Sequence, residues 1–100
     1  MSDNGLPKYK TATVPASTAA LAGAAGQHRL IGFVLFGGSA DSQVEFKDAA
    51  SDTGTVLVAA NALAKTSIHV DLSEYGGVMF NTGLFVKPAG TGAICYVWHD

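Results

Sequence analysis

The last third of the sequence, residues 66–98, consists of short apolar runs separated by turns that contain glycine. Short runs rich in Val, Ile, Phe and Tyr are typical of β-strands, and the Gly, Asn and Asp between them are typical of tight turns. Strands that follow one another this closely pair antiparallel, because parallel neighbours need long crossover connections. The pattern therefore predicts an antiparallel sheet around which the rest of the chain is built.

Strand-like segments continue upstream at residues 8–14, 29–36, 43–47 and 55–58. The segment 29–36 is apolar throughout, and strict alternation places Leu30, Val34 and Phe36 on one face and Ile31, Phe33 and Leu35 on the other. A strand that is apolar on both faces is expected to be covered on both sides, by a second sheet, an Ala-rich segment or another subunit. With turns spaced as in sandwiches and barrels, the sequence predicts an all-β fold. We expect a single antiparallel β-sandwich of seven to eight short strands, jelly-roll-like or Greek-key.

The chain of 100 residues has the length of one domain. Residues 1–7 are polar and turn-rich and are expected to form a flexible N-terminal arm, and residues 8–100 to form the sandwich domain. Within it, residues 16–27 are an Ala/Gly-rich connector, for which helix propensity predicts about two helical turns. Residues 59–65 are read as a second, shorter connection of small residues.

Charged residues are scarce, at 14% of the chain against about 25% in ordinary soluble domains. The deficit favours a surface covered by neighbouring subunits, although a compact neutral domain coated with Thr, Ser and Gly remains an alternative. A net charge of −2 with six basic residues argues against nucleic-acid binding. No apolar run approaches the roughly 20 residues of a membrane helix, and the N-terminus lacks a secretory signal. We expect no membrane contact and synthesis in the cytoplasm.

Side chains capable of chemistry do not form a recognisable motif. His28, His69 and His99 do not pair at a metal-ligand spacing, so we read them as solvent-facing or hydrogen-bonded. Cys95 alternates in register with Ala93 and Val97, which predicts a buried apolar role and not a nucleophile. We therefore predict no catalytic residue, no cofactor and no metal, and a protein that is not an enzyme.

Aromatic and apolar residues are the remaining candidates for a functional surface. Ile94, Tyr96 and Trp98 share the face opposite Cys95, and two interpretations are open for them. Burial preference favours the inner core, and the alternative is an exposed stripe that binds a partner. The candidate interface residues are Tyr9, Leu21, Tyr75, Tyr96 and Trp98.

The order of these segments resembles that of the small virion structural proteins of tailed bacteriophages. The resemblance covers residues 8–98 and rests on a strand near 8–14, the apolar strand 29–36, and the segments VEFKD (44–48) and SDTGTVL (51–57). It continues through DLS (71–73) and the C-terminal FNTGLFVKPAGTGAICYVW (80–98).

This resemblance implies a non-enzymatic protein located in the virion. It implies a capsid decoration (cement) protein that bridges major-capsid subunits and associates with itself, commonly as a homotrimer. The alternative is a head-fibre, tail or baseplate recognition module, which could bind carbohydrate through Tyr75, Tyr96 and Trp98.

Overall fold

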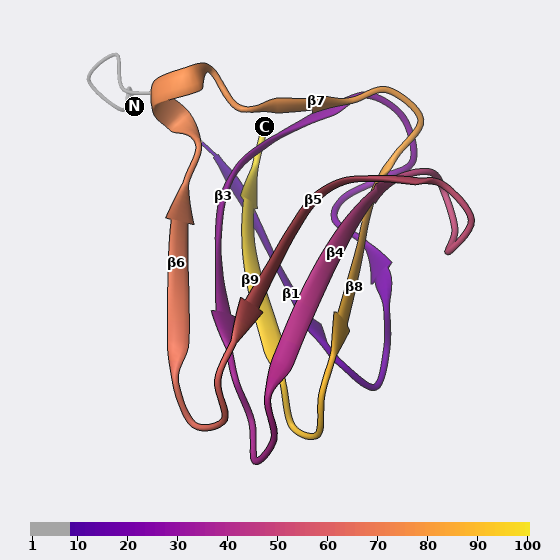
Figure 1. The fold of residues 1–100 in the computed structure, drawn as a ribbon. Helices are drawn as coiled ribbons and strands as arrows, with labels where there is room; N and C mark the ends of the chain where they lie inside the picture. The colour runs from indigo at the N-terminus through magenta and orange to yellow at the C-terminus, as the bar shows by residue number, and fades with distance from the viewer. Residues whose placement is uncertain (1–8) are drawn as a thin grey trace.

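Two antiparallel sheets pack face to face in the computed structural model, which describes residues 9–100 (Figure 1). Sheet A contains β1 (Lys10–Pro15), β9 (Ile94–His99), β3 (His28–Phe36), β6 (Ser67–Asp71) and β7 (Val78–Phe80). Sheet B contains β2 (Ala20–Leu21), β8 (Leu84–Ala89), β4 (Ser42–Asp48) and β5 (Thr55–Ala62). A short 3₁₀ turn, η1 (Ser73–Tyr75), joins β6 to β7. The predicted all-β antiparallel sandwich is confirmed, whereas the predicted arm, residues 1–7, lies outside the described residues.

The strand pairing is that of a jelly roll. β6 and β7 pair with successive halves of the same edge of β3, so together they act as one strand. The pairs then nest along the chain: β4 with β5, β3 with β6 and β7, β2 with β8, and β1 with β9. Alternate pairs of this long hairpin share a sheet: the pair β1/β9 lies beside β3/β6 in one sheet, and the pair β2/β8 lies beside β4/β5 in the other, which gives the orders β1-β9-β3-β6 and β2-β8-β4-β5. Of the two topologies expected, the jelly roll is the one observed.

The core lies between the sheets and is built by alternation along each strand. Val44 and Phe46 point inward from β4, as predicted, and the Phe46 ring lies 4.6 Å from that of Phe33 between centroids. Ile68 and Val70 pack against the same core from β6. Each strand thus contributes one apolar face, which is the condition for two sheets to share a core.

Strict alternation fails in β3. Leu30 lies in the core with Phe33 and Leu35, whereas Val34 and Phe36 point to the outside of sheet A. The register with β9 shifts between Leu30 and Gly32, and this irregularity moves Leu30 to the opposite face from the predicted one. Neither the second sheet nor the Ala-rich segment covers the outer face of β3, since Phe36 is 45% exposed, and cover by another subunit stays a prediction.

The two Ala-rich segments are more extended than predicted. Residues 16–27 contain turns, bends and the two-residue strand β2, and no helical turn. Ala22 is fully buried in the core, so packing, together with Gly23 and Gly26 at positive φ, overrides alanine's helix propensity. Similarly, β5 continues to Ala62 instead of ending at residue 58, because Ala60 and Ala62 face the core in register with Val58.

At one end of the sandwich, the turns joining β3 to β4, β5 to β6 and β8 to β9 bind one another. Ser39 donates a backbone hydrogen bond to Thr91, and Lys65 donates one to Gly38. A Cβ atom at Gly38 would lie 2.0 Å from the Thr91 carbonyl oxygen, so this close approach requires glycine. Across residues 9–100, no helix has the length and apolar character needed to span a membrane.

Candidate functional site

The outward-facing residues of sheet A form a regular grid. The register across β1, β9, β3 and β6 aligns them in three rows of four. We call this set the sheet A face. Its rows are Thr11, Trp98, Gly32 and Asp71; Thr13, Tyr96, Val34 and His69; and Pro15, Ile94, Phe36 and Ser67.

The middle of the sheet A face is apolar and aromatic, and the two edge strands, β1 and β6, contribute mostly polar side chains. Phe36 and Tyr96, 45% and 38% exposed, meet edge to face with ring centroids 5.3 Å apart and planes at 83°. The Trp98 ring lies 5.8 Å from the imidazole of His69. A hollow of about 470 Å³ on this face is lined by the rings of Phe36, Tyr96 and Trp98, together with Thr11 and Val34. An apolar centre rimmed by Thr, Ser, His and Asp is the arrangement found in protein interfaces.

The sheet A face carries almost no charge. The acidic and basic side chains on it are Asp71 and His69, both on the edge strand β6. The side-chain hydroxyl of Ser73 donates to the Asp71 carboxylate over 2.6 Å and the Ser73 backbone N–H over 2.9 Å, and these bonds lower the pKa of Asp71. That carboxylate is therefore satisfied locally, and the centre of the sheet A face can leave water without stranding a charge.

The outside of sheet B has the opposite character. The loop after β4 brings Asp52 between two lysines, where it forms an ion pair with Lys47 and another with Lys87 at 2.9 Å. The hydrogen bond from Lys47, followed by that from Lys87, lowers the pKa of Asp52, and the hydrogen bond to Asp52 raises the pKa of Lys87. Charged groups paired in this way favour a solvated surface, so the two outer faces differ in polarity.

The five predicted interface residues are not brought together as one patch. Tyr96 and Trp98 are neighbours on the sheet A face, so the preference for placing them in the core is wrong. Tyr75 is 81% exposed on η1, Tyr9 is exposed just before β1, and Leu21 is partly buried on β2 in the other sheet.

Sequence reasoning missed Phe36 and Val34 as members of the exposed aromatic surface. The signal was present, because residues 29–36 are apolar on both faces and the second face needs a cover. Within the described chain no segment supplies that cover, and Phe36 stays exposed.

Two histidines that are distant in sequence meet in space. β9 runs beside β3, so His99 lies next to His28 with the rings edge to face and 5.3 Å apart. Both Nδ1 atoms are within hydrogen-bond distance of the Asp100 main-chain oxygen, at 3.2 Å for His28 and 3.0 Å for His99. The prediction of hydrogen-bonded histidines holds for this pair, although His99 is buried. Among residues 9–100, no three potential ligand side chains gather in a geometry that could hold a metal ion.

Cys95 is fully buried between the sheets, as the sequence predicted. Burial raises the pKa of its thiol to about 12. The nucleophilic thiolate is therefore almost absent at neutral pH, which fits the apolar role.

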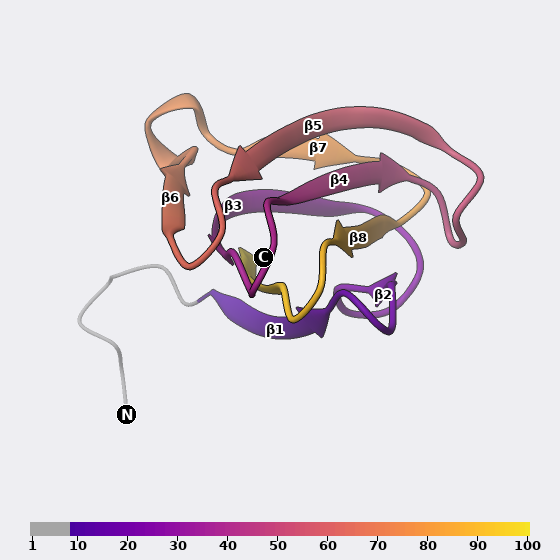
Figure 2. The ribbon, with the colours of Figure 1, turned by 60° about the horizontal axis from the view of Figure 1, so that its bottom comes forward.

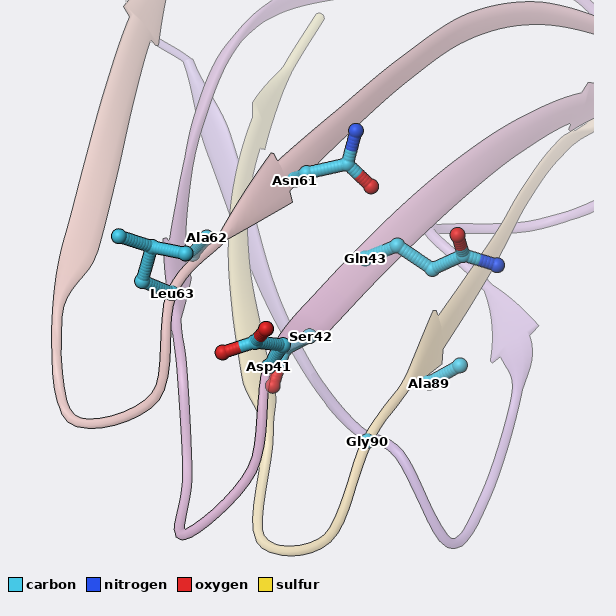
Figure 3. A pocket seen from close by; sticks show the side chains of 8 residues that line it. All are labelled: Asp41, Ser42, Gln43, Asn61, Ala62, Leu63, Ala89 and Gly90. Carbon is cyan, nitrogen blue, oxygen red and sulfur yellow. The ribbon is translucent and has the colours of Figure 1, made fainter.

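A second hollow of about 430 Å³ opens on the outside of sheet B, near the end where the turns meet (Figure 3). Gln43 on β4 and Asn61 on β5 are paired in register there, and the Gln43 side chain extends toward β8. One oxygen of the Asp41 carboxylate accepts a hydrogen bond from the Ala64 backbone N–H over 2.9 Å. These groups offer hydrogen bonds around a floor of small residues.

Comparison with known proteins gives no match: no protein-family model, no curated protein and no solved structure is similar enough to this chain to place it in a family.

Proposed function

We propose that this chain is a non-enzymatic structural protein that docks on other proteins through the sheet A face. The observation that carries this proposal is a neutral aromatic surface, centred on Tyr96 and Phe36, outside a sandwich whose core lies entirely on the other side of the sheet. Aromatic side chains placed in this way contribute strongly to binding and little to the fold.

The proposed setting is the head of a tailed bacteriophage, where the chain acts as a decoration protein between major-capsid subunits. The strand order agrees with this setting, since jelly rolls are frequent in viral capsids, although they also occur in lectins and cupins. Because one architecture hosts many functions, the proposal of a capsid decoration protein is supported by the sheet A face together with the sequence resemblance.

The size of the sheet A face suits repeated weak contacts. Four strands about 4.8 Å apart and three rows about 6.8 Å apart cover roughly 400 Å² in plan. A standard stable interface buries about 800 Å² on each partner, so this face alone gives a weak contact. Many such contacts on a lattice hold firmly through avidity.

The carbohydrate-binding alternative is less well supported by the ring geometry. Sugars stack on exposed aromatic faces, and a flat platform requires neighbouring rings that lie nearly parallel to the surface. Phe36 and Tyr96 meet at 83°, so the two rings cannot both lie flat against one sugar chain. Edge-to-face rings are instead well suited to packing against the side chains of a partner protein.

Electron microscopy of virions that carry this chain tests the proposed function. The expected result is extra density on the head between capsid subunits, with the outer side of β9 and β3 turned toward the shell. Tyr96→Lys should abolish decoration, whereas Gln43→Lys, which adds the same charge outside sheet B, should leave it unchanged. Density on the tail, or on no part of the particle, would contradict the proposal.

A further inference from the structure

A jelly roll leaves four sheet edges, and here they lie at β1 and β6 in sheet A and at β2 and β5 in sheet B. An edge strand presents unpaired N–H and C=O groups that can pair with another chain. Proteins that avoid such pairing shorten the edge, place charges or proline on it, or bend it. The four edges of this sandwich are not equally protected.

Three edges carry recognisable protection. β1 begins with Lys10 and ends at Pro15, which has no N–H to donate. β2 is only two residues long. β6 has five residues, ends at Asp71, and is followed by the η1 turn before β7 resumes along β3.

β5 is the exception. It has eight residues, and the sequence from residue 53 to residue 64 contains no charge and no proline. Figure 2 shows β5 as the outermost strand of sheet B, and the pairing found for it among the described residues is with β4. One extra residue, Leu57, shifts its register with β4, so the part of the edge with unbroken register is residues 58–62.

Two exposed leucines flank this segment, residues 58–62, symmetrically. Leu57 is 43% exposed and Leu63 is 68% exposed, and each lies three residues from Ala60. In Figure 3 the Leu63 side chain, just after the end of β5, points away from β4 toward the side on which β6 lies. Large exposed apolar side chains at both ends of an unprotected edge indicate a contact surface.

We infer that β5 is a self-association edge, on which a second copy of this chain pairs antiparallel about a two-fold axis at Ala60. Residue numbers opposite each other then sum to 120, so Leu57 of each copy meets Leu63 of the other. Between them, Ala59 faces Asn61, and Ala60 faces its own copy. Residues 57–63 carry no charge, so no like charges face each other in this pairing. The segment is therefore complementary to itself, and we take a second copy of the chain as its partner.

This pairing is independent of the proposed function. β5 and the sheet A face belong to different sheets, so a paired dimer leaves the aromatic surface free on both copies. A two-fold pair also differs from the homotrimer that the phage resemblance implies. The two assemblies therefore separate in a measurement of mass.

Sedimentation velocity of the full chain over a wide concentration range tests the edge. The expected result is a reversible monomer–dimer equilibrium. Leu63→Lys, which removes both symmetric leucine contacts and adds a charge at each end, should weaken dimerisation by at least about 100-fold. Tyr9→Lys is the matched control, since Tyr9 is 40% exposed just before β1, at the edge of sheet A opposite β6, and it should leave the equilibrium unchanged.

Hydrogen exchange supplies a second readout. Raising the concentration of the unmodified chain should slow amide exchange in residues 58–62, and dilution or Leu63→Lys should reverse the effect. A monomer at every concentration, a trimer, or a dimer that survives Leu63→Lys would overturn the pairing. None of these results bears on whether Tyr96→Lys abolishes decoration, so the two proposals fail separately.

Discussion

Two phenylalanine truncations separate the core of this protein from its exposed aromatic face. Phe46 is fully buried and lies against Phe33 in the core, whereas Phe36 lies on the sheet A face and is 45% exposed. The same substitution by alanine at the two positions removes the same atoms from two different environments. The loss of unfolding free energy in each variant therefore shows how much the ring at that position contributes to the stability of the fold.

The expected losses follow from burial. Phe46→Ala removes a buried ring and leaves a cavity, which costs about 3–5 kcal/mol. Phe36→Ala removes a half-exposed ring and its edge-to-face contact with Tyr96, and leaves no enclosed cavity, so we expect a loss of about 1–2 kcal/mol.

Urea unfolding of the dilute full chain, followed by circular dichroism, measures both values. If the slope of the unfolding free energy against urea concentration is the same in each variant as in the parent, each variant unfolds as the parent does. If Phe36→Ala destabilised the chain as much as Phe46→Ala does, the sheet A face would be part of the folded core and our assignment of it as a docking surface would be refuted.

Three further outcomes follow from the same structure. Cys95, with its pKa raised by burial to about 12, should resist iodoacetamide at pH 8 until the chain is unfolded in urea; rapid alkylation of the folded chain would contradict its burial. Asp48 accepts a hydrogen bond from the Thr82 N–H over 2.7 Å, and this bond lowers its pKa. Its stabilisation is therefore complete above the ordinary carboxyl range of about 4 and is lost as pH falls through the lowered value, so urea midpoints measured between pH 7 and pH 2 should depend less on pH in Asp48→Asn. Gly38→Ala should lower the thermal midpoint markedly, because its Cβ would lie 2.0 Å from the Thr91 carbonyl oxygen; an unchanged midpoint in calorimetry would show that these turns separate freely.

The sequence predicted those parts of the fold that depend on local alternation. Cys95 and Val97 face the core and Val44 and Phe46 oppose them, as a period of two requires. The order of the strands was not predictable in the same way, because nested pairing depends on contacts such as that of Lys10 with His99, which no local pattern encodes.

The prediction failed where tertiary structure overrides a local rule. A single register shift beside Gly32 reverses the face on which Leu30 lies, and alternation contains no signal for it. Burial of Ala22 draws an Ala-rich segment into turns and a short strand.

The candidate site was only partly predictable. Tyr96 and Trp98 were proposed from their spacing, but the choice between core and surface depended on which side of β9 the second sheet covers. Phe36 joins them because β3 pairs with β9, a contact between residues that are far apart in sequence.

The central claim is that the sheet A face is the docking surface, and Trp98 allows it to be tested directly. It is the one tryptophan of the chain, and it lies on this face. Acrylamide quenching of the free protein should be substantial, because Trp98 is partly exposed. After binding to particles assembled with tryptophan-free shell proteins, the account predicts that quenching of Trp98 falls sharply. Quenching that stays the same in the bound protein would contradict the account.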